Sequence, residues 1–278
     1  MHSKTDLIRL ALAEDIGPGD ITTDNLIPED QIGTGTILAK ESMVVAGLQV
    51  ARTVFFQLDA DVTINCMVAD GDAVESGTVL MTLAGNMRAL LTGERTALNF
   101  LQRLCGIATF VQSHVKQLGN ARVRLVDTRK TTPGWRALEK YAVRVGGAAN
   151  HRFGLYDGVL IKDNHIAACG GITAAVQRAR GMASHLIKIE VETSDLEEVR
   201  EALACNVDVI MLDNMDIEGI REAVAVINGQ ALVEVSGGIS REDLPGLAQT
   251  GVDIISVGAL THSARAMDIS MRILSPDA

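Results

Sequence analysis

The sequence predicts an α/β protein in which an incomplete parallel α/β barrel follows an N-terminal α+β domain. In the second half of the chain, short β-branched runs alternate with helix-compatible segments, and the later runs recur about every 22 residues, the length of one βα unit. Near-continuous apolar runs such as residues 209–212 are typical of strands buried in a parallel sheet. The first of these strands is not followed by a G-x-G-x-x-G motif, which favours a barrel over an open, doubly wound sheet.

The first third of the chain has a mixed pattern, which we interpret as an α+β domain. Helices are predicted at residues 5–14, 48–57 and 92–104, and strands at residues 35–40, 61–65 and 79–83. We expect this domain to span residues 1–105 and the barrel to span residues 106–263, with the segment 264–278 packing back on the first domain. Arg95 lies near the start of the helix predicted at 92–104, either as a surface arginine or held there to meet an anion.

One stretch of the first domain, residues 68–80, resembles half of a biotinyl or lipoyl carrier hairpin. Such a carrier needs a lysine at an exposed turn, and no lysine occurs between Lys40 and Lys116. We therefore interpret this stretch as structural turn chemistry.

Six strands are predicted in the barrel, at residues 122–127, 158–162, 186–192, 207–213, 231–236 and 252–257. Charged or glycine-rich groups stand at the end of every one of them. In a parallel barrel the carboxyl ends of all strands face one mouth, where barrel active sites lie. One such group could arise by chance, but the repetition after six strands indicates a functional site.

Positive charge is concentrated between residues 127 and 165, although the whole protein carries 25 Lys plus Arg against 35 Asp plus Glu. Four of these cations, Arg129, Lys130, Arg152 and Lys162, lie at or near strand ends. We expect them to form an anion site, because like charges gathered at one mouth repel each other unless an anionic ligand compensates them.

Three other cations have helical spacing. Arg136, Lys140 and Arg144 are separated by four residues each, and we interpret them as the solvated face of a helix.

Carboxylates stand at the ends of two neighbouring strands. Glu192 and Asp213 could hold Mg²⁺, accept ribose hydroxyl groups or stabilise an oxocarbenium-like centre. Glu190 shares a strand face with Glu192, but pairing with Lys188 or Lys162 is an alternative role for it.

Glycine-containing loops follow the last two strands. Backbone N–H groups in such loops can cradle a phosphate, and two of them in succession match a known phosphate position in barrels. The first loop contains Ser236, Gly237 and Gly238, and the second contains Gly258. His262 either contributes to this site or is an ordinary surface histidine.

The composition limits the class of protein. A net charge of −10 argues against nucleic acid as the partner, but not against a small anionic substrate in a local basic pocket. Cys66, Cys105, Cys169 and Cys205 are scattered, which indicates buried thiols in a reducing compartment and argues against a metal site. No apolar run is long enough to span a membrane, and the first residues do not resemble a signal peptide, so we expect a cytoplasmic protein.

The motifs, taken in order, closely resemble the quinolinate phosphoribosyltransferase family over nearly the whole chain. The motifs are RTALNFLQR at 95–103, DTRKTTPG at 127–134, NHR at 150–152, GLYD at 154–157, LIKDNH at 160–165, EVE at 190–192, MLDN at 211–214 and VSGGI at 235–239. DTRKTTPG and KDNH are specific in combination. The sequence departs from the family pattern at Trp135 and at Ala148–Ala149, where no ligand is expected.

The resemblance implies a reaction and a set of site residues. Quinolinate and phosphoribosyl pyrophosphate would give nicotinate mononucleotide, pyrophosphate and carbon dioxide. The resemblance places Arg95, Arg129, His151, Arg152 and Lys162 around the quinolinate carboxylates, Lys130 between both substrates, and Glu192 and Asp213 at the ribose and its magnesium. It places Ser236, Gly237, Gly238 and Gly258 at the 5′-phosphate, with Thr128, Val257, Ala259 and His262 as further substrate-binding positions. Lys130, Glu192 and Asp213 are the expected catalytic residues.

The resemblance also implies an assembly, and it leaves alternatives open. It implies a homodimer in which Arg95 reaches the neighbouring site, and a hexamer is compatible with it. The alternatives are a relative of the same fold linked to molybdenum uptake, a barrel aldolase with Lys130 or Lys162 as a Schiff base, and a non-enzymatic binding protein. The last of these leaves the aligned strand-end groups unexplained.

Overall fold

The computed structural model describes residues 4–119 and 122–274, which form two compact units. The first unit comprises residues 1–112, 131–147 and 260–278, and the second comprises residues 113–130 and 148–259. Within the described ranges, no helix is long and apolar enough to cross a membrane.

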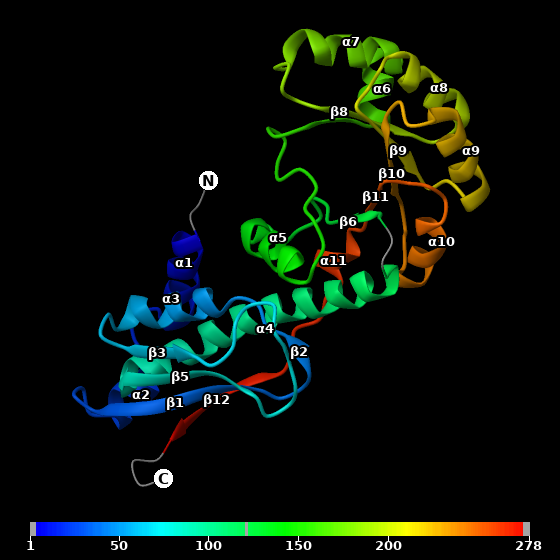
Figure 1. The fold of residues 1–278 in the computed structure, drawn as a ribbon. Coiled ribbons are helices and arrows are strands. Elements are labelled where there is room, and N and C mark those ends of the chain that lie inside the picture. Colours follow the sequence, from blue (N-terminus) through cyan, green and yellow to red (C-terminus); the bar gives the residue numbers. More distant parts are fainter. Residues whose placement is uncertain (1–3, 120–121, 275–278) are drawn as a thin grey trace. The chain divides into compact units, whose positions relative to one another are not determined.

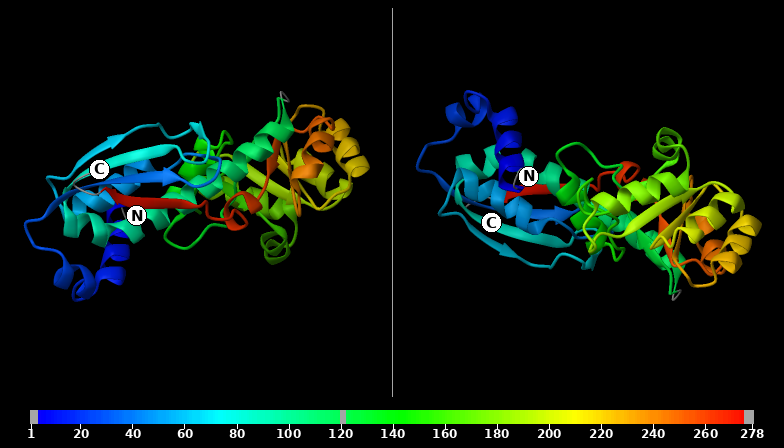
Figure 2. Two further views of the ribbon diagram at one scale, coloured as in Figure 1. Left: turned by 90° about the horizontal axis from the view of Figure 1, so that it is seen from below. Right: turned by 90° about the horizontal axis from the view of Figure 1, so that it is seen from above.

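The first unit is built on an antiparallel sheet with helices packed on it (Figures 1 and 2). The sheet has the order β12-β1-β5-β3, and β2 pairs with β4 in a small separate ladder. The elements are α1 (Lys4–Ile16), α2 (Ile21–Leu26), β1 (Ile32–Ala39), β2 (Met43–Val44), α3 (Leu48–Leu58), β3 (Thr63–Cys66), β4 (Ala73–Val74), β5 (Val79–Asn86), α4 (Met87–Leu118), α5 (Arg136–Val145) and β12 (Ile269–Leu274). Residues 113–118 of α4 belong to the second unit.

The core of the first unit forms where α3 and α4 cover the sheet. Ile37 and Leu80 from the strands are fully buried, as are Phe55 of α3 and Phe100 of α4. The ring of Trp135 stacks on Phe100, with 4.6 Å between ring centroids. The departure from the family pattern at Trp135 therefore has a packing role.

The C-terminal segment is held against α4. β12 pairs with β1 from Thr34↔Leu274 to Ala39↔Ile269. Gly106 of α4 faces this segment so closely that a Cβ there would lie 1.9 Å from the carbonyl oxygen of Arg265. Only glycine therefore permits this approach of the two backbones.

Helix α4 is longer than the sequence predicts, and this corrects the placement of Arg95. The helix begins at Met87, where the Asn86 side chain accepts a hydrogen bond from Ala89 N–H at 3.2 Å. Gly93 lies inside the helix. A Cβ at this position would lie 3.0 Å from the Leu58 and Phe55 side chains, so the close packing favours glycine here. Arg95 is thus in the helix interior, exposed, and not near a helix start.

Helix α5 corrects a second prediction. Arg144 is exposed, as expected of a solvated face, but Lys140 is 1% exposed. The i, i+4 spacing is misleading here because α5 is covered on more than one side, with Leu138 and Val143 also buried.

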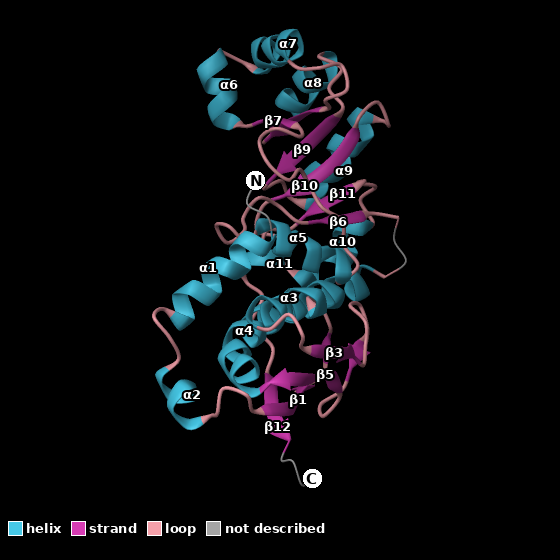
Figure 3. Cartoon of the chain, turned by 90° about the vertical axis from the view of Figure 1, so that its left-hand side faces the viewer, coloured by secondary structure: helices cyan, strands magenta, loops and turns pink. Residues whose placement is uncertain are grey.

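The second unit is an incomplete parallel barrel of six strands in the order β6-β11-β10-β9-β8-β7 (Figure 3). All its strand pairs are parallel, and the sheet ends at β6 and β7, which are consecutive in the chain. A closed barrel would pair those two strands. The strands are β6 (Arg124–Val126), β7 (Val159–Ile161), β8 (Ile189–Thr193), β9 (Val209–Asp213), β10 (Leu232–Ser236) and β11 (Ile254–Ser256). The predicted fold class is confirmed.

Helices form the outer layer of this unit (Figure 1). They are α6 (Asp163–Cys169), α7 (Ile172–Met182), α8 (Leu196–Ala204), α9 (Ile217–Ile227), the 3₁₀ turn η1 (Arg241–Asp243) and α10 (Leu244–Ala248). A short helix, α11 (Ala259–His262), follows the last strand, and its residues 260–262 belong to the first unit. Asp195 and Asp216 cap α8 and α9 by accepting backbone N–H groups of the first turn. The caps fix where each helix starts relative to the strand before it.

Candidate active site

Asp127 joins the two most basic motifs of the chain. It follows β6, is fully buried, and accepts hydrogen bonds from Asn150 Nδ2 at 2.7 Å and from His151 N–H at 2.9 Å. An isolated bridge between Val126 and Ala149 brings the two segments together just before these residues. The buried carboxylate therefore fixes the NHR motif beside the end of β6.

Arg129 and Arg152, one from each of these motifs, repel each other through their positive charges. Burial lowers the pKa of the Arg152 guanidinium, and the charge of Arg129 lowers it further. Arg152 Nη1 also donates to the carbonyl oxygen of Gly158 at 2.9 Å. Two guanidinium groups held this way gain from a ligand that carries more than one negative charge.

Lys162 stands at the start of α6, directly after β7, and forms an ion pair with Glu192 at the end of β8. Of the two alternative partners considered for Glu190, Lys188 and Lys162, the structure thus pairs Lys162 with Glu192. Glu190 instead faces His151, with 3.1 Å between Glu190 Oε2 and His151 Nε2. The strand period explains the difference, because Glu192 lies one pleat nearer the mouth than Glu190.

The end of β9 is coupled to the loop after β10. Asp213 pairs in register with Ser236, and Asn214 N–H donates to the Ser236 carbonyl oxygen at 3.1 Å. Asn214 Nδ2 donates to Asp213 Oδ2 at 2.6 Å. Gly237 has φ of 100°, and a Cβ there would lie 2.2 Å from Asn214 Oδ1, so the loop requires glycine at this position.

The end of β11 lies beside β6. Val257 N–H donates to the Val126 carbonyl oxygen at 3.0 Å, so Gly258 and Ala259 continue from a strand end next to the DTRK motif. In that motif, Thr128 Oγ1 accepts a hydrogen bond from the exposed Lys130 N–H at 3.0 Å.

Two expected site residues belong to the first unit. Arg95 is exposed on α4, and the exposed His262 lies with its Nδ1 2.9 Å from Ser263 Oγ. The other expected residues belong to the second unit, where most follow a strand, while His151 and Arg152 lie in the loop before β7 that Asp127 ties to the end of β6.

Sequence reasoning missed Glu234, which is 1% exposed in the middle of β10. Glu234 Oε1 lies 3.5 Å from His151 Nε2, in a cluster completed by Glu190. The signal was available, since a glutamate inside the apolar run LVEVS is unusual in a buried strand.

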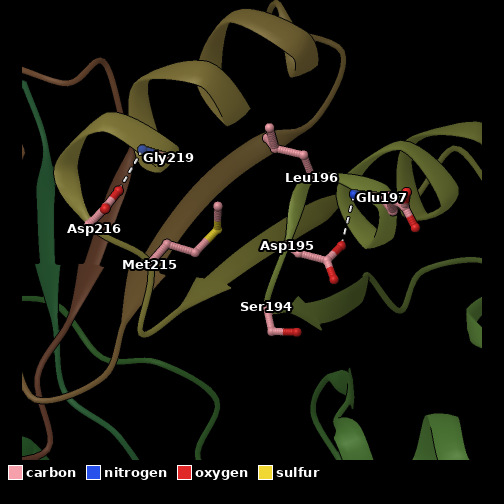
Figure 4. Close-up of a pocket in the computed structure, with 7 residues that line it drawn as sticks. All are labelled: Ser194, Asp195, Leu196, Glu197, Met215, Asp216 and Gly219. Atoms are coloured by element: carbon pink, nitrogen blue, oxygen red, sulfur yellow. Dashed lines mark hydrogen bonds between the residues drawn. The ribbon is translucent and has the colours of Figure 1, made fainter.

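An acidic depression lies outside this set, behind the ends of β8 and β9 (Figure 4). It encloses about 530 Å³ and is lined by Ser194, Asp195, Leu196, Glu197, Met215, Asp216 and Gly219. No cation lines it, and Asp195 and Asp216 point at the helix starts that they cap. It is therefore unsuited to an anionic substrate.

The strand ends of the second unit thus combine three kinds of chemistry. Guanidinium and ammonium groups suit a small polyanion, the carboxylates Glu192 and Asp213 suit hydroxyl groups or a developing cation, and the Gly237–Gly238 turn presents backbone N–H groups. This combination suits a reaction that transfers a phosphorylated sugar to an anionic acceptor.

Comparisons with known proteins agree with this reading. Residues 20–105 match the family described as "Quinolinate phosphoribosyl transferase, N-terminal domain", and residues 107–272 match its C-terminal domain. A protein of Bacillus subtilis named probable nicotinate-nucleotide pyrophosphorylase (carboxylating) is 47% identical over 260 residues, covering 94% of this chain and 90% of that protein. The chloroplastic nicotinate-nucleotide pyrophosphorylase of Arabidopsis thaliana is 41% identical, covering 98% of this chain and 84% of that protein.

Solved structures show the same relationship. The crystal structure of NadC from Streptococcus pyogenes superimposes with a TM-score of 0.93 at 43% identity, covering 97% of this chain and 96% of that one. The nicotinate-nucleotide pyrophosphorylase of Francisella tularensis gives 0.93 at 43% identity, covering 98% and 96%. The chain belongs to the quinolinate phosphoribosyltransferase family.

Proposed function

We propose that this protein transfers the phosphoribosyl group of phosphoribosyl pyrophosphate to quinolinate, with decarboxylation, and so makes nicotinate mononucleotide for NAD synthesis. The observation that carries the proposal is the gathering of cations, carboxylates and a glycine turn at the strand ends of one parallel sheet. The relatives named above are phosphoribosyl-transferring enzymes, which favours this reaction over the aldolase and the molybdenum-linked alternatives.

Quinolinate is a dicarboxylate, and the basic residues of the second unit suit it. Arg129 and Arg152 repel each other without a ligand, and a dianion relieves that repulsion. Arginine can bind each carboxylate through two parallel hydrogen bonds, which orients the ring. Lys162 is held by Glu192, so quinolinate would compete with this carboxylate for the ammonium group.

The carboxylates act on the sugar in this proposal. Glu192 and Asp213 accept hydroxyl hydrogen bonds of the ribose and stabilise the positive charge that develops at its anomeric carbon when pyrophosphate leaves. Lys130, which is exposed just beyond β6, stabilises the departing pyrophosphate next to quinolinate.

The same two carboxylates fit Mg²⁺. Oxygen ligands from one or two carboxylates plus substrate phosphates are the usual set for this ion, and Glu192 and Asp213 stand at adjacent strand ends. When bound with the substrate, Mg²⁺ would neutralise charge on the pyrophosphate.

Backbone groups hold the 5′-phosphate in this proposal. Ser236, Gly237 and Gly238 follow β10, and Val257, Gly258 and Ala259 follow β11. Gly237 and Gly238 have positive φ values of 100° and 57°, so the chain turns sharply after β10, and backbone N–H groups of such a turn can bind an anion.

We further propose a homodimer in which Arg95 completes the site of the neighbouring subunit. Its exposed position on α4 supports this role, because one isologous contact then serves two sites at once. The cysteines are unpaired thiols, which supports a reducing, cytoplasmic location, although only Cys105 is buried as the sequence predicts and Cys66 is exposed.

A substrate-dependence assay tests the proposed reaction. Purified protein with Mg²⁺ should release pyrophosphate only when both quinolinate and phosphoribosyl pyrophosphate are present. Nicotinic acid lacks one carboxylate and leaves cations unpaired, so its kcat/KM should be lower by roughly 10² to 10⁴. Equal values for the two acceptors would refute the dicarboxylate assignment, and pyrophosphate release without any acceptor would refute the transfer.

A further inference from the structure

Two buried glutamates that contact His151 have no role in the reaction as described above. Glu190 of β8 and Glu234 of β10 have side chains that are 10% and 2% exposed, and both face His151. The ligating atoms of these three residues lie within 4.8 Å of one another.

The proton on His151 is placed by its neighbours. Arg152 N–H donates to His151 Nδ1 at 2.8 Å, so that nitrogen must offer a lone pair. The hydrogen of a neutral imidazole then lies on Nε2, which is 3.1 Å from Glu190 Oε2. The geometry thus gives a neutral His151 that donates to Glu190.

The same tautomer decides against a metal ion in the cluster. A histidine ligates a metal through a nitrogen lone pair, and the one lone pair of neutral His151 already accepts Arg152 N–H. Since Nε2 carries the hydrogen, the nitrogen that faces the two glutamates cannot act as a ligand.

Glu234 lacks the surroundings of an ionised carboxylate. Its strand neighbours are Met211 on β9 and Ile254 on β11, and those of Glu190 are Leu160 on β7 and Val209 on β9. Both Glu190 Oε1 and Glu234 Oε1 are buried without a hydrogen-bond partner. A hydrogen on Glu234, donated to Glu190, removes a like-charge contact and pairs a buried acceptor.

The charges around the cluster agree with this assignment. Burial, and then the charge of Glu190, raise the pKa of Glu234 to about 7, whereas the Ser256 hydroxyl on β11 acts in the opposite direction. A positive charge on His151 would also lower this pKa, but the neutral tautomer that accepts Arg152 N–H carries no such charge. The charge of Glu190 acts on Arg152 in the opposite direction to the charge of Arg129, so the cluster is coupled electrostatically to these two arginines.

We propose that Glu234 and Glu190 are positioning residues that hold His151 and Arg152 through a continuous hydrogen-bond relay. Glu234 donates its carboxyl hydrogen to Glu190, Glu190 accepts Nε2–H of His151, and His151 Nδ1 accepts the backbone N–H of Arg152. The relay orients the backbone from which Arg152 extends its guanidinium group. Its effect on catalysis rests on the proposed function, in which Arg152 binds quinolinate.

The hydrogen positions are tested by ¹⁵N NMR of histidine-labelled protein at about pH 6, with the signals of His151 assigned by their loss in His151→Gln. A free histidine, with a pKa near 6.5, would be mostly imidazolium at that pH. We expect the widely separated ring shifts of a neutral Nε2–H tautomer. An imidazolium pattern or an Nδ1–H tautomer would overturn the relay, and this result does not depend on turnover.

The role in catalysis is tested by two substitutions of similar size. Glu234→Gln keeps a donor toward Glu190, whereas Glu234→Leu removes it. We expect KM for quinolinate to rise roughly 10- to 100-fold in Glu234→Leu, with KM for phosphoribosyl pyrophosphate unchanged, and to stay within about threefold in Glu234→Gln. Asp253→Asn is the control, because Asp253 accepts Val233 N–H at the opposite end of the same strands.

The outcomes separate the relay from the proposed reaction. Equal effects of the Gln and Leu substitutions, or equal changes in both KM values, would overturn the positioning role. If the expected His151 tautomer is observed but quinolinate is not consumed, the relay stands and the proposed reaction fails.

Discussion

The buried carboxyl of Glu234 makes stability depend on pH, and substituting it should remove that dependence. Its pKa is raised from 4.5 to about 7, chiefly by burial. Below the lower value both the folded and the unfolded chain carry the proton. Between the two values only the folded chain keeps it, so the free energy of unfolding falls by about 1.4 kcal/mol per pH unit. Above the higher value both states are ionised and this stabilisation is lost.

The magnitude follows from the same shift. A difference of about 2.5 pKa units corresponds to about 3 kcal/mol, of which about 2.5 kcal/mol is lost between about pH 5 and pH 8. Glu234→Gln has no proton to lose in this range. Between about pH 5 and pH 8, its free energy of unfolding should therefore fall by about 2.5 kcal/mol less than that of the wild type. Glu41, whose pKa is lowered to about 2, titrates below the range.

Urea unfolding followed by far-UV circular dichroism measures this difference at both pH values. The experiment needs the wild type, Glu234→Gln and the Asp253→Asn control, with the control following the wild type. An equal loss of stability in wild type and Glu234→Gln would refute the reasoning, because it would mean that Glu234 is ionised in the folded protein already at about pH 5.

Three further predictions concern other parts of the chain. Gly237→Ala places a Cβ 2.2 Å from the Asn214 side chain at positive φ, so kcat/KM for phosphoribosyl pyrophosphate should fall at least about tenfold. The fall in kcat/KM should be smaller in Gly238→Ala, because no atom lies within 4 Å of a Cβ at that position. Glu139→Ala removes a fully buried carboxylate that pairs with the partly exposed Arg103, and should lower the free energy of unfolding by about 3 kcal/mol in urea titrations; a smaller loss than in Glu139→Gln would contradict this. Arg95→Ala and Lys130→Ala chains, each nearly inactive, should regain up to roughly a quarter of wild-type activity when co-expressed, and verified heterodimers without activity would exclude a shared site.

The sequence was sufficient for the barrel strands because their signal is local. An apolar β-branched run predicts a buried strand, and repetition at one unit length predicts a parallel arrangement. Once the strands are parallel, geometry places Lys162, Glu192 and Asp213 at one end of the sheet without further information. The sequence alone therefore predicts the polar residues at the strand ends.

Tertiary structure decided the features that depend on what packs against a residue. The sequence could not show that Lys140 is buried, because helical spacing does not reveal how many sides of α5 are covered. It could not show that α4 begins at Met87, because glycine has a low helix propensity and Gly93 therefore lowers the predicted helix content of this stretch. Only the structure shows that Phe55 packs closely against this glycine. Both depend on neighbours distant in the chain.

The partners of the buried carboxylates were also decided only in three dimensions. Asp127 and Glu234 are recognisable as charged residues in or beside apolar strands, but their contacts to His151 cross from one strand or loop to another. The sequence determined that polar groups converge at the strand ends, since strand direction alone fixes that. Which of them pair, and which carries a proton, depends on distances of a few ångströms and on exclusion of water, which only the packed fold sets.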